Sequence, residues 1–424
     1  MEEADYCTAC SAKEGDNMPL VSIIVPAYRA EECIGYCLRS LECQVFNCIE
    51  IIVVNDASPD NTISVINEQM KLDKRIKIIN LSFNCGTLGA RKAGVLASTG
   101  DYVLLVDQDD ELDHEAIRKL VEYATSHPAD IYHFSARVLA TGDAAARARE
   151  GMEGFLTPSA RRIEGPDILR IQLLESGGFD WHVHHKMFDG DFARRCYSLA
   201  SDERLVLSDD IYMSFILCSQ AQSYEVVPNA PWYIYHLGRG ETYGKVLDLE
   251  AYGRLAAADG KALLLARGYV ESPASPARND WGDRLDDLRD RLVFHAMNEW
   301  MDSLPDDLKD GGCDIALGHL PADAVCGELY RFVRDKAYAL LQQRDRLSEE
   351  AKVLERETLH LLELARRAEA APGFDESNGR YREMKDIACC HLRDCGLVVE
   401  EPADSVPTGL IHRLVRMIRE AMGR

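Results

Sequence analysis

Short apolar runs rich in Val and Ile alternate with amphipathic stretches between Leu20 and Phe134, and this alternation restricts the fold more than any other feature. Apolar runs of this length are typical of strands buried on both faces of a sheet. The predicted strands are Val21–Val25, Ile49–Val54, Arg75–Ile79, Tyr102–Val106 and Asp130–Phe134. The predicted helices between them lie near Glu31–Glu42, Asp60–Leu72, Thr87–Ser98 and Asp113–Ser126. Such repetition predicts an α/β fold with a mostly parallel sheet, in which ligands bind beyond the carboxyl ends of the strands.

The predicted α/β domain spans residues 19–245 in two halves. The first half covers about residues 19–135, and a second α/β stretch covers about residues 165–245. Between them, residues 141–165 are polar and contain glycines, which predicts a loop or an insertion. Residues 1–18 are acidic and polar and predict a disordered leader.

The pattern changes after this domain, and residues 246–424 predict a mainly helical C-terminal region. Residues 328–370 form a long charged helical segment, which indicates a helical hairpin or an imperfect coiled coil and makes it a candidate homodimer contact. Residues 410–424 predict an amphipathic helix, with apolar side chains on one face and arginines away from it. Such a helix can contact an anionic membrane surface or dock against its own helical domain, and both interpretations stay open.

The formal net charge of -23 argues against nucleic acid as a partner, because binding to a phosphate backbone needs a basic face. The 14 cysteines are scattered, and the first residues lack the basic and apolar segments of a signal peptide. We therefore expect a cytoplasmic protein with reduced thiols, with peripheral contact to the inner face of the membrane as the alternative. Cys7 and Cys10 have the spacing of half a zinc or redox motif, but unpaired thiols are the favoured interpretation.

Polar and mostly acidic residues follow three of the predicted strands. Pro26–Arg29 follows the first strand, Asn55–Asp60 the second and Asp107–Asp110 the fourth. Two aspartates spaced by one residue can direct their carboxylates to one Mg²⁺ or Mn²⁺ ion, since such side chains share one side of an extended segment. Each motif alone also fits a turn or a helix N-terminus. Their shared position at one sheet edge favours a site for a metal and a diphosphate.

Taken together, these stretches resemble the family 2 glycosyltransferases, which have a GT-A fold. The matching segments, in the order and spacing usual for that family, are Val21–Glu32, Ser40–Gln44, Ile49–Thr62, Asn84–Gly94 and Gly100–Leu112. The resemblance implies an inverting transferase with a nucleotide diphosphate-sugar donor, expected to be a UDP-sugar, and Mn²⁺ or Mg²⁺ as cofactor. It also implies that the first half of the domain binds the nucleotide and the second half binds the acceptor.

The resemblance further implies roles for single residues. Asp56 matches the carboxylate that accepts a hydrogen bond from the uracil N3–H, and Tyr28 offers a flat face to the base. Arg91 matches a phosphate contact, with a helix-surface ion pair as the alternative, although Lys92 stands where the family usually has Asn. The expected nucleotide-binding residues are Pro26, Ala27, Tyr28, Glu31, Asp56 and Arg91. The expected metal ligands are Asp107, Asp109 and His236.

In the acceptor half, Leu205–Leu217 is similar to a second acidic motif of the family, with Asp209 and Asp210 in place of Glu-Asp. The acceptor hydroxyl must lose its proton as it attacks the anomeric carbon, so a general base is needed there. Asp210 is the expected base and Asp209 the main alternative, while helix capping is the structural alternative for both. Further donor or acceptor contacts are expected from Lys186, Arg239 and Thr242.

A histidine cluster, His182, His184 and His185, precedes Lys186. His182 and His184 could share one face of a strand, but no nearby Cys or His in the sequence completes a tetrahedral zinc set. Acceptor contacts or ordinary packing are therefore favoured over zinc.

These features predict an enzyme that transfers a sugar to a hydroxyl of a glycan or glycolipid, as in the synthesis of bacterial-type cell-surface polysaccharides. A dinucleotide-binding dehydrogenase is excluded, because the turn after the first strand lacks the Gly-x-Gly-x-x-Gly pattern. A nucleotidylyltransferase is disfavoured, because no glycine-rich basic loop follows that strand. A catalytically silent protein that binds sugar nucleotides or acts as a scaffold stays as the main alternative.

Overall fold

The computed structural model describes residues 18–175, 180–239 and 246–397. The chain separates into two compact units, Met1–Leu320 and Pro321–Arg424. The strands, all in the first unit, are β1 (Val21–Ala27), β2 (Ile49–Asn55), β3 (Ile76–Asn80), β4 (Tyr102–Leu105), β5 (Glu111–Leu112), β6 (Ile131–Ala140), β7 (Arg162–Glu164), β8 (Lys186–Asp189) and β9 (Ser223–Leu237).

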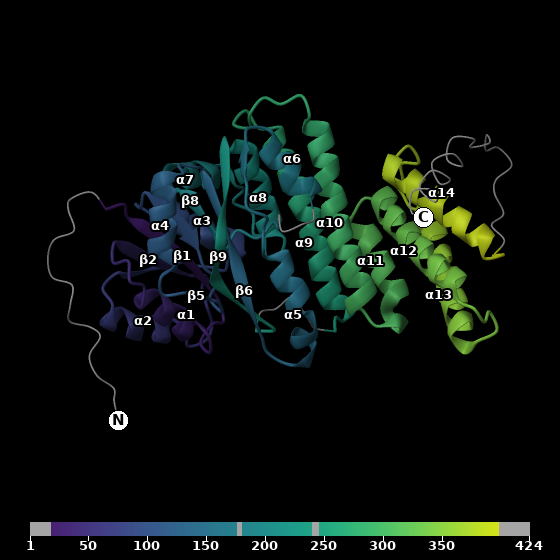
Figure 1. Cartoon of the computed structure of the whole chain (residues 1–424), viewed down its shortest axis with the longest axis horizontal. Helices are drawn as coiled ribbons and strands as arrows, with labels where there is room; N and C mark the ends of the chain where they lie inside the picture. Colours follow the sequence, from purple (N-terminus) through teal and green to yellow (C-terminus); the bar gives the residue numbers. More distant parts are fainter. Residues whose placement is uncertain (1–17, 176–179, 240–245, 398–424) are drawn as a thin grey trace. The chain divides into compact units, whose positions relative to one another are not determined.

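The helices of the first unit are α1 (Ile34–Glu42), α2 (Thr62–Leu72), α3 (Gly86–Ala97), α4 (Ala116–Ser126), α5 (Asp143–Phe155), α6 (Asp167–Leu174), α7 (Gly190–Leu199), α8 (Asp209–Gln220), α9 (Leu249–Val270), α10 (Trp281–Ser303) and α11 (Lys309–His319), with a 3-10 helix at Asp306–Leu308. The second unit contains α12 (Ala322–Gln342), α13 (Glu349–Glu369) and α14 (Gly379–Asp394). Figure 1 shows the first strands in purple and blue and the helices α9 to α11 in green.

All strands belong to one mixed sheet in the order β3-β2-β1-β4-β8-β6-β9-β5, with β7 paired to β9. The strands β3, β2, β1 and β4 run parallel, as predicted for the first half. The short strand β8 lies antiparallel between β4 and β6, and β6 and β9 beyond it again pair in parallel. The α/β class is thus confirmed, and the sheet is mixed because β8, β5 and β7 run antiparallel to their neighbours.

Strands β1 and β2 are buried along their whole length because helices cover both faces of the sheet. Along β1, Ile24 belongs to one apolar core, which includes residues of α3 and α8, whereas Ile23 and Val25 belong to a second core, which includes residues of α1 and α4. Side chains alternate between the faces of a strand, so a strand covered on both sides needs apolar residues at every position. This explains the continuous apolar runs in the sequence.

The prediction of a loop over residues 141–165 is wrong, because the helix α5 forms within this segment. Its first turns contain the run Ala144–Arg149, whose alanines and arginines are strong helix formers. Met152 and Ala145 of this helix are buried in the second apolar core. Local propensity and one apolar side of the helix therefore outweigh the glycines that suggested a loop.

The long helical segment predicted over residues 328–370 contains most of α12 and all of α13, with a break between the two helices. The break falls at residues 343–348, where the Ser348 hydroxyl accepts a hydrogen bond from the Ala351 N–H at 3.1 Å and caps α13. Homodimer formation through this segment stays a prediction. The amphipathic helix predicted over residues 410–424 and the leader predicted over residues 1–18 lie outside the described residues, apart from Met18.

Two further sequence predictions concern membranes and thiols. Within residues 18–175, 180–239 and 246–397, no helix is both long and apolar enough to cross a bilayer. Every cysteine in the same ranges is a free thiol. Cys7 and Cys10 lie outside them.

Candidate active site

A cavity of about 1170 Å³ lies where β1, β2 and β4 end, and its opposite wall comes from residues near α8, α9 and α10. We call these two sides the donor wall and the acceptor wall. The donor wall includes Pro26, Ala27, Tyr28, Glu31, Asp56, Arg91, Asp107 and Asp109. The acceptor wall includes Trp181, His182, Ser208, Asp209, Asp210, Leu255, Asp259, Leu292 and His295. The three strand ends named from the sequence therefore meet at one cavity.

Asp56 is fixed by the first turn of α3. Its two carboxylate oxygens accept hydrogen bonds from the backbone N–H groups of Cys85 (2.6 Å) and Gly86 (2.9 Å). Gly86 has φ of +77°, and a Cβ there would lie 2.7 Å from the Leu205 carbonyl oxygen, so only glycine fits. Burial raises the pKa of Asp56, and these two N–H groups oppose that shift. Each oxygen keeps lone-pair capacity for a further donor at the cavity surface.

Asp107 and Asp109 form a pair of neighbouring carboxylates on the donor wall. One oxygen of Asp107 accepts a hydrogen bond from Arg91 at 2.6 Å. No described side chain donates a hydrogen bond to Asp109, and burial together with the charge of Asp107 raises its pKa to about 6. Two close carboxylates in this state favour a cation between them, so the pair fits a divalent metal ion with oxygen ligands.

Asp110 differs from these two residues although it follows them directly. It is buried, and its carboxylate accepts hydrogen bonds from the Tyr233 hydroxyl (2.8 Å) and the His236 N–H (2.8 Å). Burial and the charges of Asp109 and Asp107 raise its pKa well above the usual range. Asp110 thus joins the acidic motif to β9, where it stabilises the end of the sheet.

Arg91 connects the acidic motifs of the two walls. Its guanidinium is buried and donates hydrogen bonds to Asp107 (2.6 Å), Asp209 (2.8 Å) and Asp210 (2.6 Å). Arg91 therefore forms ion pairs, as in the alternative prediction, but it does so at a buried position and not on the helix surface. A phosphate contact by Arg91 stays a prediction.

Asp209 and Asp210 begin α8 at the cavity. Asp209 is the more enclosed of the two, with 6% of its side chain exposed against 20% for Asp210. Burial is the main cause that raises the pKa of Asp209. Ser208 does not cap α8 through its side chain. Its hydroxyl donates a hydrogen bond to Asp259. The greater exposure of Asp210 makes it the better placed of the two to meet an acceptor hydroxyl.

The backbone around the cavity includes several unfavourable conformations. Leu207 and Ser208, directly before Asp209, have φ of 64° and 52°. Arg29 after β1 and Ala57 after β2 also have positive φ values, 51° and 53°. Each such non-glycine residue costs about 1–3 kcal/mol and is kept only where the surrounding structure holds it.

The remaining predicted residues have mixed positions. Arg239 lines the cavity. His236 lies away from the lining, with its imidazole 2.7 Å from Glu111. Lys186 is buried against Asp180 (3.2 Å to Oδ1) and the His182 carbonyl oxygen. Thr242 lies outside the described residues.

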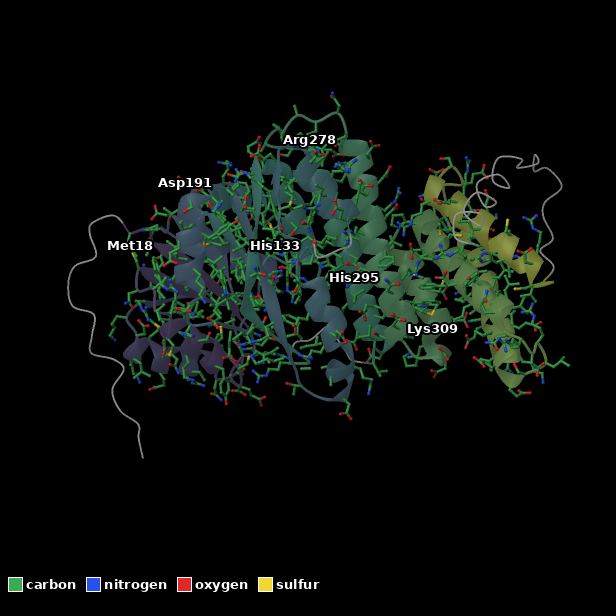
Figure 2. The ribbon with its side chains drawn as sticks, viewed as in Figure 1. Met18, His133, Asp191, Arg278, His295 and Lys309 are labelled. Carbon is green, nitrogen blue, oxygen red and sulfur yellow. The ribbon has the colours of Figure 1, made fainter. Side chains whose placement is uncertain are left out.

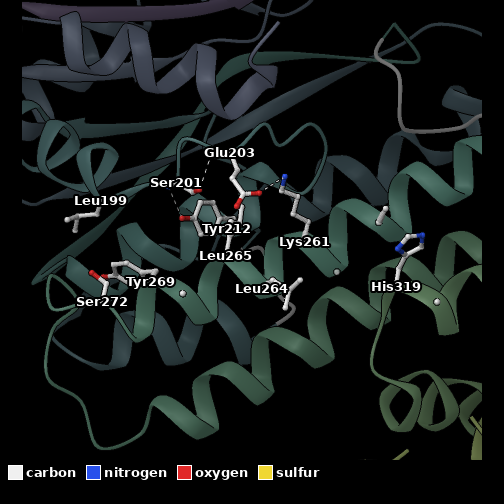
Figure 3. Close-up of a pocket in the computed structure, with 14 residues that line it drawn as sticks. Leu199, Ser201, Glu203, Tyr212, Lys261, Leu264, Leu265, Tyr269, Ser272 and His319 are labelled. Atoms are coloured by element: carbon white, nitrogen blue, oxygen red, sulfur yellow. Dashed lines mark hydrogen bonds and ion pairs between the residues drawn. The ribbon is translucent and has the colours of Figure 1, made fainter. Parts of the chain in front are cut away.

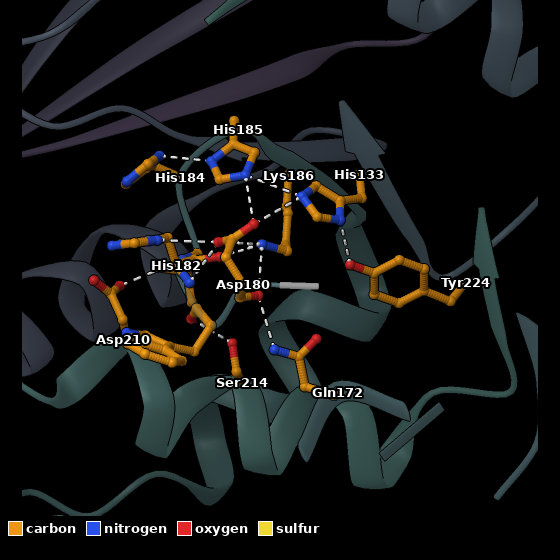
Figure 4. Close-up of polar contacts among 12 residues, drawn as sticks. His133, Gln172, Asp180, His182, His184, His185, Lys186, Asp210, Ser214 and Tyr224 are labelled. Carbon is orange, nitrogen blue, oxygen red and sulfur yellow. Dashed lines mark hydrogen bonds and ion pairs between the residues drawn. The ribbon is translucent and has the colours of Figure 1, made fainter. Parts of the chain in front are cut away.

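Figure 4 shows the polar cluster around Asp180, which the sequence revealed only in part. The Nε2 atoms of His133 and His185 lie 3.0 Å apart, and they are 3.1 and 3.0 Å from Asp180 Oδ2. These three buried groups form a candidate metal-binding set. His133 comes from β6, far from the other two in the sequence, so inspection of the local histidine cluster could not find it.

A second cavity, of about 770 Å³, lies beside α8 and α9 (Figure 3). Its charged side chains, Lys261 and Glu203, pair with each other at 2.8 Å. The Tyr212 hydroxyl in its wall accepts a hydrogen bond from the Ser201 N–H. These groups already satisfy one another, so this cavity is a weaker candidate for a reaction site.

Comparison with known proteins decides the family. Residues 22–179 match the model of glycosyl transferase family 2. This chain contains a family 2 glycosyltransferase domain. The matched residues of this glycosyltransferase domain include Asp56, Arg91, Asp107 and Asp109, whereas Asp210 and the helices α8 to α10 lie beyond the match.

Individual relatives of the glycosyltransferase domain share its first part. An uncharacterized glycosyltransferase of Haemophilus influenzae is 43% identical over 108 residues, which are 26% of this chain and 33% of that protein. A GalNAc(5)-diNAcBac-PP-undecaprenol beta-1,3-glucosyltransferase of Campylobacter jejuni is 34% identical over 116 residues, 27% of this chain and 38% of that protein. The chain thus spans 33% of the length of the first relative and 38% of the second.

One solved structure has a fold similar to that of this chain. The crystal structure of S. aureus TarS 1-349 in complex with UDP-GlcNAc has a TM-score of 0.53 and 17% sequence identity, and the alignment covers 91% of this chain and 95% of that chain. At this identity the likeness concerns the fold alone. It supports the GT-A fold that the sequence motifs predicted.

Proposed function

We propose that this protein transfers a sugar from a nucleotide diphosphate-sugar, a UDP-sugar, to a hydroxyl of a glycan or glycolipid acceptor, with inversion at the anomeric carbon. The proposal rests on one observation. A single cavity brings the carboxylates Asp56, Asp107 and Asp109 of the donor wall to face Asp210 of the acceptor wall. An enzyme of this kind needs a nucleotide site, a site for diphosphate charge and a base at one cavity.

Each wall has a distinct chemical task in this proposal. Asp56, held by the N–H groups of Cys85 and Gly86, would accept the uracil N3–H, and Tyr28 would border the base. Asp107 and Asp109 would hold Mn²⁺ or Mg²⁺. The metal would neutralise the charge that develops on the leaving diphosphate.

Inversion requires one in-line displacement. Asp210 would take the proton of the acceptor hydroxyl as its oxygen attacks the anomeric carbon, and the bond to the diphosphate would break on the opposite side. Asp209 stays the alternative base. Arg91 holds Asp210 at 2.6 Å, so the base is oriented before the acceptor arrives.

Two related proteins support the choice of donor and acceptor. TarS, whose fold resembles this one, has been crystallised with UDP and with UDP-GlcNAc. The Campylobacter jejuni relative is by name a beta-1,3-glucosyltransferase on an undecaprenol-linked glycan. A β-linked product from an α-linked donor requires inversion.

Ligand-dependent thermal stability tests the proposal. UDP, GDP, CDP and common UDP-sugars would be added with and without Mn²⁺, because a ligand that binds the folded state raises the melting temperature. We expect metal-dependent stabilisation by UDP and by one UDP-sugar. The variant Asp107→Ala should lose the metal-dependent part, whereas Asp191→Ala, at an exposed position of α7, should keep it.

A different pattern would reject parts of this proposal. If no nucleotide stabilises the protein, the silent-scaffold alternative replaces the enzyme. If Asp107→Ala keeps the full effect of Mn²⁺, the metal assignment is wrong.

A further inference from the structure

Two imidazoles on the acceptor wall are held in the same way, although they come from distant parts of the chain. His182 precedes β8, and His295, which is labelled in Figure 2, lies on α10. His182 Nδ1 lies 3.1 Å from Asp180 Oδ1, and His295 Nδ1 lies 3.0 Å from Asp259 Oδ2. Both aspartates are completely buried. Each imidazole that lines the cavity is therefore backed by a carboxylate inside the protein.

This arrangement determines which imidazole nitrogen is available in the cavity. A carboxylate accepts only, so Nδ1 must carry the proton, and in the neutral ring Nε2 keeps its lone pair. Among the described residues, none forms a hydrogen bond with Nε2 of His182 or of His295. A polar atom fixed in direction and left unpaired on a cavity wall is suited to a ligand hydroxyl.

Trp181 lies beside both imidazoles. Its ring stacks near His182 with centroids 6.1 Å apart and meets His295 edge-on at 5.9 Å. The Trp181 carbonyl oxygen accepts a hydrogen bond from Ser214 of α8 at 2.6 Å, which fixes this segment to the helix of the proposed base. The three rings thus form one aromatic surface with hydrogen-bonding nitrogens.

Hydrogen bonds connect this aromatic surface to Asp210 and to Ser208, which lies two residues before Asp210. The Val183 N–H, next to His182, donates to Asp210 Oδ1 at 3.4 Å. Asp259, which holds His295, also accepts a hydrogen bond from the Ser208 hydroxyl at 2.5 Å. A ligand bound to the two imidazoles would therefore lie next to Asp210.

We propose that Trp181, His182 and His295 form the acceptor subsite and bind a pyranose ring of the glycan acceptor. A pyranose has an apolar C–H face, which packs on an aromatic ring, and hydroxyls at its edge, which hydrogen-bond to the two Nε2 atoms. This inference rests on the proposed glycosyl transfer and assigns the residues that recognise its second substrate.

A metal ion at the Asp180 cluster is the competing interpretation. His133, Asp180 and His185 have suitable donor atoms. However, the Lys186 ammonium lies 3.2 Å from Asp180 Oδ1 and already balances its charge. A buried dication would leave an excess of positive charge there, which is costly in a low-dielectric interior. The contacts thus favour Asp180 as a residue that positions His182.

The test uses the full chain and two separate readouts. Calorimetry with UDP and Mn²⁺ measures the donor side. Saturation-transfer NMR with methyl glycosides of glucose, galactose, N-acetylglucosamine and N-acetylgalactosamine, in the presence of UDP, measures the acceptor side. The variants are His182→Ala, His295→Ala and Trp181→Ala, with His182→Gln and His295→Gln as conservative forms and His114→Ala, at an exposed position, as the control.

We expect at least one methyl glycoside to bind the wild type. Each alanine variant should weaken that binding by about tenfold, the effect of one lost hydrogen bond or ring contact. UDP binding should not change. The glutamine variants should recover part of the affinity, because their amide reaches the position of Nε2. A merely structural role would not produce this recovery.

Four results would overturn the inference. They are no binding of any of these glycosides to the wild type, unchanged glycoside binding in all alanine variants, equal loss of UDP and glycoside binding, and a stoichiometric metal in the purified protein that His182→Ala removes. Failure of the proposed function appears differently, as absence of UDP binding in the wild type. The glycosides alone can then still be tested on the same variants.

Discussion

Carboxylates have opposite roles on the two walls of the cavity. On the donor wall, burial and the charge of Asp107 raise the pKa of Asp109, and no described side chain donates a hydrogen bond to Asp109. On the acceptor wall, Asp180 and Asp259 are completely buried and orient the imidazoles His182 and His295. The comparison teaches that the carboxylate of Asp109 on the donor wall has no cation paired with it among the described residues, whereas the buried carboxylates of the acceptor wall are already paired with imidazoles.

Arg91 lies between these two arrangements. It is the cation shared by Asp107 of the donor wall and by Asp209 and Asp210 of the acceptor wall. The comparison can therefore be tested at four points: at the base, at the shared cation, at the metal pair and at the edge of the acceptor wall.

The largest effect is expected for the base. Asp210→Asn should keep UDP binding and lower the rate of sugar transfer by about 10²–10⁴-fold, because the amide cannot take the acceptor proton. Transfer rates with radiolabelled donor and UDP calorimetry measure the two effects. Asp202→Asn, at an exposed position, is the matched control. Full activity of Asp210→Asn would move the base to Asp209 or elsewhere.

The next largest effect is a loss of stability when Arg91, the shared cation, is replaced. Arg91→Met should lower the free energy of unfolding by about 3–5 kcal/mol at pH 7.5, since it leaves three neighbouring aspartates without their cation. The aspartates of the variant protonate at a higher pH, so the difference from the wild type should shrink as the pH falls towards 4. Urea denaturation at several pH values measures this. An equal difference at all pH values would mean that Arg91 acts through packing.

A smaller change in the free energy of unfolding, opposite in sign, is expected for a substitution in the metal pair. The pKa of Asp109 is raised from 3.8 to about 6, so its folded form holds a proton that the unfolded chain releases, and stability is lost as the pH rises from about 4 to 6. Asp109→Asn should therefore stabilise the metal-free protein by about 1–2 kcal/mol at pH 7.5, after allowance for its partial exposure.

The same variant tests whether Asp109 is a metal ligand. Asp109→Asn should lose the stabilisation by UDP that depends on Mn²⁺. In the wild type, this stabilisation should weaken as the pH falls below about 6, because protons then compete with the metal for Asp109. Metal-dependent UDP binding that does not vary between pH 5 and 7.5 would count against Asp109 as a ligand.

The smallest effect is expected at the edge of the acceptor wall. Ser208→Ala removes one hydrogen bond to Asp259 and should cost about 0.5–1.5 kcal/mol of stability. Acceptor KM should rise severalfold while UDP affinity stays the same. A change in UDP affinity instead would show that the two walls are not separate.

The sequence predicted the donor wall well because its chemistry follows directly after buried strands. The runs ending near Val25, Val54 and Val106 are apolar throughout, so the strand ends and the residues after them could be located from local pattern. Parallel pairing then brings those ends together. Asp56, Asp107 and Asp109 line the cavity as expected.

The acceptor wall could not be predicted in the same way, because its members pair over long distances in the chain. His182 with Asp180 is a local pair, but His295 depends on the packing of α10 and on Asp259 of α9. A lone histidine within an amphipathic helix has no local signal for such a role. The prediction of a loop over residues 141–165 failed for another reason, since helix-forming residues and the burial of one side of α5 outweigh the glycines of that segment.

Leu207 and Ser208 show how the cavity depends on the finished fold. Their left-handed backbone is unfavourable for an isolated chain. The segment is held by Leu88 of α3, whose N–H donates to the Leu205 carbonyl oxygen at 3.3 Å, and by Asp259 of α9, which accepts a hydrogen bond from Ser208. The turn that leads into α8 is thus held from one side by a helix that precedes it in the chain and from the other by a helix that follows it. Its conformation is therefore complete only when both helices are packed against it.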